Sequence, residues 1–192
     1  MCLQTIQTVN IDNNMEMGPS GRYYLRVYKQ MDRKSIKGKE YWVAPYRVAT
    51  LMEYQSKIDH LVFKPGVNAD TNRKYIEWGS FLHSNTTCGP EISAMYPPGY
   101  HSYLCSKLPK HLHWEIITAC VPLMSVVTTG LQDDMPAIVS RIIILPGYPQ
   151  KYISVAAADR LYVEYMRQNK QDYTQKGQRH VVYYFPKNTG GC

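Results

Sequence analysis

Apolar, β-branched runs in the second half of the chain predict neighbouring strands. They cover residues 114–121, 125–129 and 138–145. Runs of this length and composition are typical of strands that are buried on at least one face. The linker 130–136 is rich in Gly, Asp and Pro, which favour turns. We therefore expect an antiparallel hairpin here, with a bend or a sheet edge at Pro122, which has no N–H for a ladder.

Strict alternation of side-chain type predicts another strand over residues 22–29. The two-residue period of a strand places Tyr23, Leu25 and Val27 on one face, which we expect to face the core. The other face alternates guanidinium and phenol groups, from Arg22, Tyr24, Arg26 and Tyr28. The polar, basic segment 30–39 follows, with Gly38 as the expected turn.

Shorter segments predict the remaining elements. We expect strands at 41–48, where Pro45 favours an edge or a bulge, at 61–66, and at 180–185. A short helix is predicted over 51–58, and residues 66–94 are expected to be rich in loops.

A longer helix is predicted over residues 155–167, with Ser154 as its N-cap. Ala157, Leu161 and Tyr165 fall on one stripe, which we expect to face the core. The charged side chains lie largely off that stripe: Asp159, Arg160, Glu164 and Arg167.

The order of these elements predicts an α+β fold, with a mostly antiparallel, strand-rich core and a C-terminal helix packed on it. Residues 1–21 are polar and end in a Gly-Pro-Ser-Gly turn, so we expect a flexible N-terminal arm. Residues 22–186 are expected to form a single α+β domain, and residues 187–192 a frayed tail.

Composition narrows the choice of partners only slightly. The net charge of +7 permits a nucleic acid, an acidic protein or an anionic ligand. The chain has 17 Tyr against 3 Phe, and tyrosine suits contact surfaces because its hydroxyl can stay wet while its ring is buried.

Location is predicted from segments that the sequence lacks. No run reaches the ~18 apolar residues of a spanning helix. Residues 1–5 lack a secretory pattern, so the cytoplasm is the expected location, that of the host cell if the protein is phage-encoded. The five widely spaced cysteines predict free thiols in a reducing compartment.

The order of features from Lys39 to Leu145 resembles small uncharacterised domains of bacteria and phages. In these, a Gly-aromatic-His-x-aromatic segment, here residues 99–103, precedes a short helix and two Val-rich strands. This chain departs from that pattern at Pro109, which would shorten or end the helix. The resemblance implies no activity, and it favours an accessory protein of a phage or mobile element.

Catalytic and metal sites find little support in the sequence. The Tyr-His-Ser run at His101 resembles the opening motif of ADP-ribosyltransferase-like folds, with Ser102 in place of the usual Gly, and Glu164 is the only later acid that could serve. His111 and His113 have a spacing that zinc sites use, without a paired Cys-x-x-Cys. We therefore expect no metal and no cofactor, and we favour a protein without enzymatic activity.

Basic charge concentrates near the N-terminal strand. Residues 22–39 contain seven basic side chains and one acidic residue, Asp32, and the interleaved tyrosines offer faces for stacking. An ordinary solvated strand face would have a similar composition. The candidate ligand- or partner-binding residues are Arg22, Tyr24, Arg26, Tyr28, Lys29, Arg33, Lys34, His101 and Tyr103.

Three functions remain open at this point. We favour a binding protein without enzymatic activity that contacts a protein partner through its basic, Tyr- and Arg-rich surface. The first alternative is a nucleic-acid or nucleotide binder that uses the same surface. The second is a transferase-like enzyme centred on His101. Self-association into a homo-oligomer and the identity of the partner stay open, and no membrane partner is expected.

Overall fold

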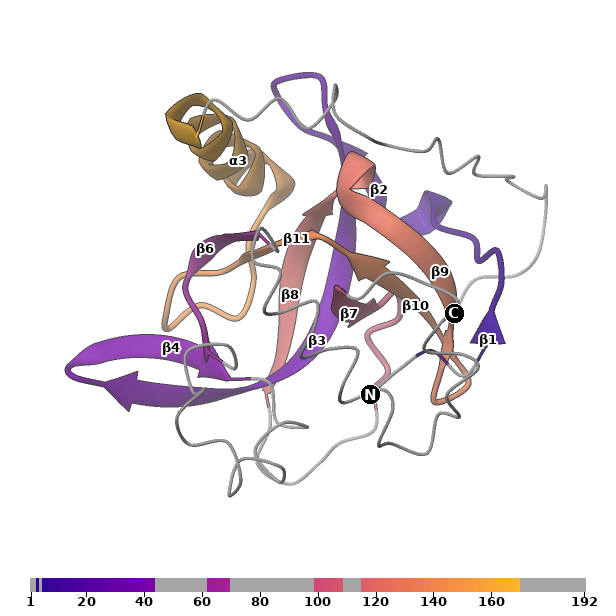
Figure 1. The fold of residues 1–192 in the computed structure, drawn as a ribbon, viewed down its shortest axis with the longest axis horizontal. Coiled ribbons are helices and arrows are strands. Elements are labelled where there is room, and N and C mark those ends of the chain that lie inside the picture. The colour runs from indigo at the N-terminus through magenta and orange to yellow at the C-terminus, as the bar shows by residue number, and fades with distance from the viewer. Residues whose placement is uncertain (1–2, 4, 44–61, 70–98, 109–114, 170–192) are drawn as a thin grey trace.

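The computed structural model describes residue 3 and residues 5–43, 62–69, 99–108 and 115–169 (Figure 1). Within these residues the strands form one 11-stranded sheet, in which every strand pair is antiparallel. The strands are β1 (Thr5–Ile6), β2 (Met15–Met17), β3 (Tyr23–Ile36), β4 (Lys39–Val43), β5 (Val62–Phe63), β6 (Gly66–Ala69), β7 (Tyr100–Tyr103), β8 (Glu115–Pro122), β9 (Val126–Gln132), β10 (Met135–Ser140) and β11 (Ile142–Leu145).

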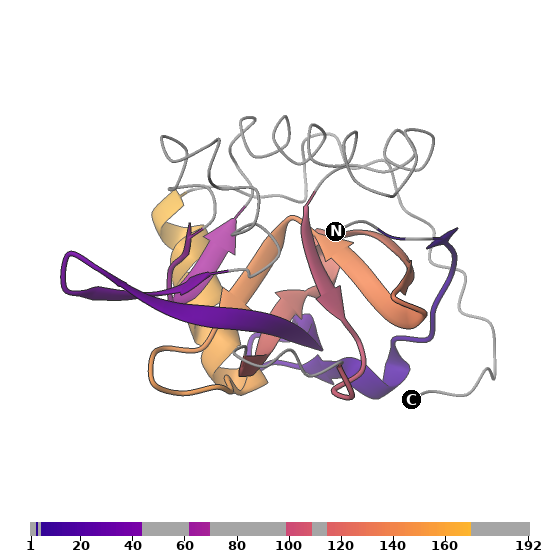
Figure 2. The same cartoon turned by 90° about the horizontal axis from the view of Figure 1, so that it is seen from below.

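The main path through the sheet runs β1-β9-β10-β7-β3-β8-β11-β6, while β2, β4 and β5 branch from it beside β3. Strand β3 is the centre of the arrangement, since it pairs with β2, β4, β7 and β8. The helix α3 (Val155–Asn169) packs on β6 and β11 (Figures 1 and 2). This arrangement confirms the predicted α+β fold, with a mostly antiparallel core and a helix packed on it.

Side chains of the sheet alternate between separate cores. Leu25 and Val27 of β3 point into the largest core, together with Ile117 and Ala119 of β8. Tyr24 points the opposite way, into a second core that the helix covers. A third core lies against β7 and β10 and includes Leu3, Tyr103, Leu108, Ala137 and Val139. Both faces of the sheet are therefore covered along part of β3.

Two tight hairpins shape the edges of the sheet. In the β9–β10 hairpin, Gln132 pairs with Met135, and the two aspartates between them have φ of 51° and 59°. In the β3–β4 hairpin, Ile36 pairs with Lys39, and Lys37 and Gly38 have φ of 52° and 75°. Positive φ at both central residues is the turn that matches the twist of a two-residue hairpin. The predicted β9–β10 hairpin and the turn expected at Gly38 are confirmed, and β3 continues into the polar, basic segment 30–39 as far as Ile36.

The apolar run 138–145 forms two strands rather than the single predicted strand. Arg141 separates β10 from β11, is exposed, and donates its backbone N–H to the Ser125 carbonyl at 2.8 Å. The chain therefore changes neighbours at this residue, from β7 and β9 to β6 and β8. The bend expected at Pro122 is confirmed, because β8 ends there and the 3-10 turn η5 (Leu123–Ser125) follows.

The N-terminal segment is packed into the fold where the structure describes it, unlike the flexible arm expected over residues 1–21. Thr5 and Ile6 pair with β9, and Met15–Met17 pair with β3, on either side of the 3-10 turn η1 (Asp12–Asn14). Ile11 is buried in the main core. A few spaced apolar side chains were enough to anchor a segment whose composition is mostly polar.

The predicted C-terminal helix is present, but it presents a different face to the sheet. The Ser154 hydroxyl accepts a hydrogen bond from the Ala157 N–H at 3.2 Å, so the predicted N-cap is confirmed. Leu161, expected in the core, is 43% exposed, whereas Asp159, expected to face solvent, is 2% exposed. The buried face is Val155, Ala158, Asp159 and Tyr162, because Asp159 finds hydrogen-bond donors on the sheet side.

Several predictions fall on other parts of the chain. Residues 66–69 form β6 rather than a loop, and the strand expected at 41–48 begins earlier, at Lys39. The helix at 51–58, the strand at 180–185 and the tail at 187–192 lie outside the described residues. No helix within the described ranges is long and apolar enough to cross a membrane.

Candidate functional site

The predicted face of alternating guanidinium and phenol groups on β3 is exposed at Arg22 but buried at Tyr24. Tyr24 is fully buried beneath α3, with its ring edge-on to the Tyr162 ring at a centroid distance of 6.2 Å. Tyr23, expected in the core, is instead 49% exposed. The pattern of alternation was right, but the helix covers one side of β3 at this point. Tyr24 is therefore closed to a stacking ligand, which corrects its place in the candidate surface.

The Tyr24 hydroxyl belongs to a buried polar cluster around Asp159. It donates to Asp159 Oδ1 at 2.8 Å, and Ser20 donates through its backbone N–H at 2.8 Å and through its hydroxyl at 2.5 Å. Burial raises the pKa of the Asp159 carboxyl, but the bonds from Ser20 and Tyr24 and the charge of Arg22 outweigh it and the net pKa is lowered. Burial, together with the bond to Asp159, raises the pKa of Tyr24. These residues connect the β2–β3 turn to the helix.

Arg26 is partly occupied by contacts within the protein. Its guanidinium lies 2.6 Å from the Glu16 carboxylate of β2, and 5.7 Å from the centroid of the Tyr152 ring. The Arg26 side chain is 36% exposed, so the pair is at the surface and contributes little to stability. Arg22 is exposed and Tyr28 is half-buried, so burial does not prevent either side chain from contacting a ligand or partner.

His101 and Tyr103 lie in β7 and face the third core, beside Val139 and Ala137 of β10. His101 is 9% exposed and Tyr103 is 3% exposed. The Tyr103 hydroxyl donates to Asp133 Oδ2 at 2.6 Å and accepts from Gln132 Nε2 at 2.6 Å. Tyr103 therefore braces the β9–β10 turn, and its burial corrects its place in a surface for partners.

The structure does not bring His101 to the acid that the transferase hypothesis requires. Glu164 lies on α3 and pairs with Arg167 at 2.6 Å, and this hydrogen bond lowers its pKa. No described contact connects it to His101. His111 and His113, which suggested a zinc spacing, lie outside the described residues, and the described residues contain no group of three His, Cys, Asp or Glu suited to a metal.

Lys29 and Arg33 also make internal contacts. Lys29 Nζ donates to the His101 carbonyl at 2.6 Å and lies 5.8 Å from the Phe63 ring centroid. Arg33 pairs with Glu115 at 2.5 Å and donates to the Tyr148 hydroxyl at 3.0 Å. Lys151 approaches the same carboxylate at 3.4 Å. These contacts fix the base of the β3–β4 hairpin to the body of the protein.

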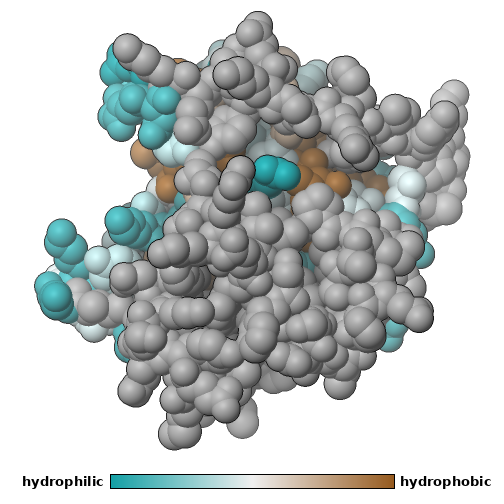
Figure 3. Space-filling view, in the orientation of Figure 1, coloured by the Kyte–Doolittle hydropathy of each residue, from teal (hydrophilic) through white to brown (hydrophobic). Residues whose placement is uncertain are grey.

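Beyond that base, the β3–β4 hairpin projects away from the other strands and the helix in both ribbon views (Figures 1 and 2). Its distal part carries Lys34, Lys37 and Lys39, which we call the lysine tip, and all three are exposed. None of them makes an ion pair or hydrogen bond with another described side chain. Hydrophilic side chains mark this edge in the space-filling view (Figure 3).

Of the candidate residues, Lys34 is exposed on this projecting hairpin, and Arg22 and Tyr28 are accessible elsewhere. The structure adds Lys37 and Lys39, which belonged to the basic segment but not to the predicted set. The sequence feature that indicates Lys37 and Lys39 is Gly38, because a two-residue turn there places the flanking lysines at the tip. Asp159 was missed because its charge suggested a solvent-exposed position.

Comparisons with protein-family models, with curated proteins and with solved structures each return no match for this chain. The resemblance over residues 39–145 therefore stays a prediction, and the case for function depends on the chain's own residues.

Proposed function

We propose that this chain is a binding protein without enzymatic activity, and that it contacts an acidic protein partner through the lysine tip of the β3–β4 hairpin. The observation that carries this proposal is the position of three exposed lysines on a hairpin that extends beyond the rest of the described fold. Charged groups that are not used within a protein are available to steer and orient a partner of opposite charge.

The anchoring of the hairpin supports this role. The ion pair of Arg33 with Glu115 and the bond to Tyr148 hold the base of the hairpin, and Trp42 of β4 is 1% exposed and donates its indole N–H to the Pro146 carbonyl at 2.9 Å. A surface that is already positioned loses less conformational entropy when it binds. The lysine tip is thus presented on a braced support rather than on a loose loop.

Two observations favour a protein over a nucleic acid as the partner. Asp32 and Glu40 lie on the same hairpin, so the surface carries both signs of charge, and a uniformly negative phosphate backbone would be repelled locally. Mixed charges suit a protein surface that offers complementary groups of both signs. The burial of Tyr24 also removes one of the two stacking faces on which single-strand recognition was predicted to depend.

Nucleic-acid or nucleotide binding remains the second candidate because the exposed cations of the tip are lysines. Lysine is a common point-charge ligand for phosphate and is depleted at the centres of protein interfaces. The accessory role in a phage or mobile element, the cytoplasmic location and self-association stay predictions.

The test is a fluorescence anisotropy titration of the full chain with a labelled glutamate-rich peptide. A variant with Lys34→Gln, Lys37→Gln and Lys39→Gln should bind about tenfold more weakly, since ~0.5 kcal/mol per exposed charge adds up to that factor. The matched control is Lys64→Gln, Arg141→Gln and Arg160→Gln, which removes three exposed charges elsewhere. Equal losses in both variants would mean that only net charge matters and would overturn the proposal.

A parallel titration with a labelled single-stranded oligonucleotide separates the two candidates. Stronger binding of the oligonucleotide than of the peptide, with affinity falling steeply between ~50 and 200 mM salt, would replace the protein partner by a nucleic acid. Binding of the peptide with a weaker dependence on salt supports the protein partner. Binding of neither probe by the full chain would refute the lysine tip as an anion-contacting surface.

A further inference from the structure

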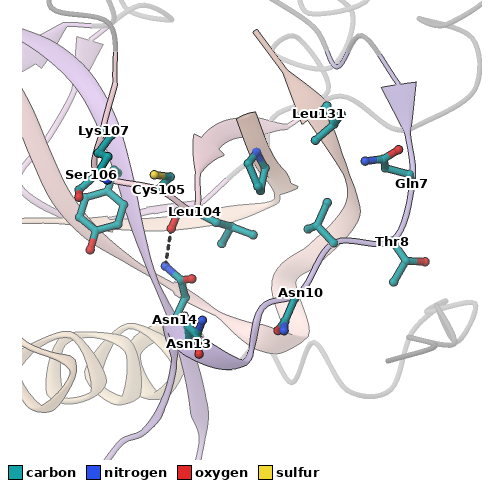
Figure 4. Close-up of a pocket in the computed structure, with 13 residues that line it drawn as sticks. Gln7, Thr8, Asn10, Asn13, Asn14, Leu104, Cys105, Ser106, Lys107 and Leu131 are labelled. Carbon is teal, nitrogen blue, oxygen red and sulfur yellow. Dashed lines mark hydrogen bonds between the residues drawn. The ribbon is translucent and has the colours of Figure 1, made fainter. Parts of the chain in front are cut away.

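A polar cavity of about 360 Å³ lies between the N-terminal segment and the residues that follow β7 (Figure 4). One wall is formed by residues 7–14 and includes Gln7, Thr8 and Asn10, and the other by residues 104–107. The cavity is independent of the lysine tip, since the two share no residue. It exists because residues 7–14 pack against the sheet, which the composition of the segment did not predict.

The lining is amide-rich and carries little charge. It includes four amide side chains, the hydroxyls of Thr8, Tyr28 and Ser106, and a single cation, Lys107, but no carboxylate. Apolar groups complete it, among them Val9 and Leu131. A lining without acidic groups does not favour a cationic ligand, and one surface lysine is a weak basis for a highly charged anion.

Two of the amides have fixed orientations. Asn14 Nδ2 donates to the carbonyls of Arg26 and Leu104, each at 2.8 Å, so its Oδ1 is left as an acceptor (Figure 4). Asn10 Oδ1 accepts from the Asp12 N–H at 2.9 Å, which leaves its Nδ2 as a donor. Carbonyls only accept and backbone N–H groups only donate, so neither amide can flip without losing its bonds. The residues that line the cavity therefore include one amide with a fixed acceptor atom, Asn14 Oδ1, and one with a fixed donor atom, Asn10 Nδ2.

We propose that this cavity binds a small polyhydroxylated ligand of the monosaccharide class. Hydroxyl groups both donate and accept, so they can satisfy Asn14 Oδ1 and Asn10 Nδ2 together, whereas a fully deprotonated anion such as sulfate only accepts. The C–H faces of a sugar ring suit the apolar groups of the lining. The volume of about 360 Å³ corresponds to roughly a dozen waters at ~30 Å³ each, and a hexose has a similar number of heavy atoms.

The test is ligand-observed saturation-transfer NMR on the full chain, with glucose, galactose and N-acetylglucosamine as separate probes. We expect transfer to at least one of them, with a Kd of about a millimolar, as is reasonable for a small polar ligand in an open site. Ser106→Trp would fill the cavity from one wall and should weaken binding at least tenfold. Ser35→Trp, on the exposed hairpin, is the matched control and should leave binding unchanged.

Each result either supports the inference or overturns it. Absence of transfer from all three sugars to the wild-type chain, or equal binding by Ser106→Trp, would overturn it. Line broadening of inorganic phosphate by the wild-type chain, without any response from the sugars, would replace the sugar by an anion. If circular dichroism shows that Ser106→Trp is unfolded, Gln7→Trp fills the cavity from the opposite wall, and the same criteria apply to it.

Discussion

The buried cluster around Asp159 makes the strongest quantitative prediction of the fold, through the substitution Tyr24→Phe. Phenylalanine keeps the ring that packs on Tyr162, so the change removes the hydroxyl and its 2.8 Å bond to Asp159 and little else. A hydrogen bond to a charged group contributes about 1.5–3 kcal/mol. Asp159 keeps both bonds from Ser20. We therefore expect the free energy of unfolding to fall by about 2 kcal/mol.

Urea denaturation followed by far-ultraviolet circular dichroism at pH 7 measures this change. A loss of ~2 kcal/mol corresponds to a Tm lower by about 4–8 °C in a chain of this length. Tyr23→Phe is the matched control, because Tyr23 is the adjacent tyrosine, is 49% exposed and should change stability by less than about 0.5 kcal/mol. The reasoning is refuted if Tyr24→Phe also stays within ~0.5 kcal/mol of the wild type.

The same variant makes a prediction about pH. The folded pKa of Asp159 is lowered, so the stability contributed by its carboxylate is present above the unfolded pKa of ~3.9 and is lost as the pH falls through the folded value. The stability difference between wild type and Tyr24→Phe should therefore narrow as the solution is made acidic. A difference that stays constant down to strongly acidic pH would mean that the Asp159 charge does not contribute to the bond.

Three further predictions address other parts of the fold. Gly99→Ala should destabilise the chain by about 1–3 kcal/mol in urea denaturation, because an added Cβ would lie 2.6 Å from the Ser140 carbonyl oxygen, and a wild-type midpoint would contradict this. Tyr103→Phe should cost about 1–3 kcal/mol, since buried Gln132 Nε2 loses its acceptor, and an unchanged unfolding curve would exclude that role. Burial raises the pKa of Cys120 to about 12, so iodoacetamide at pH 8 should leave it unmodified in peptide mass spectra until urea is added, and labelling of the native chain would disprove its burial.

The sequence predicted the sheet where strands are long, apolar and β-branched. The residues of β8, β9 and β10 carry their pattern locally, and turn residues separate them, so hydrophobic periodicity was sufficient. The boundary between β10 and β11 at Arg141 could not be predicted, because a single polar residue inside an apolar run does not show that the chain changes its neighbouring strands there. That change depends on the tertiary positions of β6 and β7, which local patterns do not contain.

The candidate site was predicted less well, since exposure depends on what packs against a strand. Period-two spacing placed Tyr24 correctly on the face opposite to Leu25, but no local signal indicated that α3 would cover that face. The helix pattern assigned Asp159 to solvent because the carboxylate is charged, whereas donors from Ser20 and Tyr24 make its burial favourable. Lys34 was identified because its basic segment and the turn at Gly38 are both local features.

The most direct test of the central claim is lysine footprinting of the full chain by amine acylation and mass spectrometry, with and without the bound glutamate-rich peptide. If the lysine tip is the contact surface, acylation of Lys34, Lys37 and Lys39 should fall on binding, while Lys64, which is also exposed, keeps its free-chain rate. Unchanged acylation at the tip under conditions in which the peptide is bound, or protection at Lys64 instead, would contradict the proposed function.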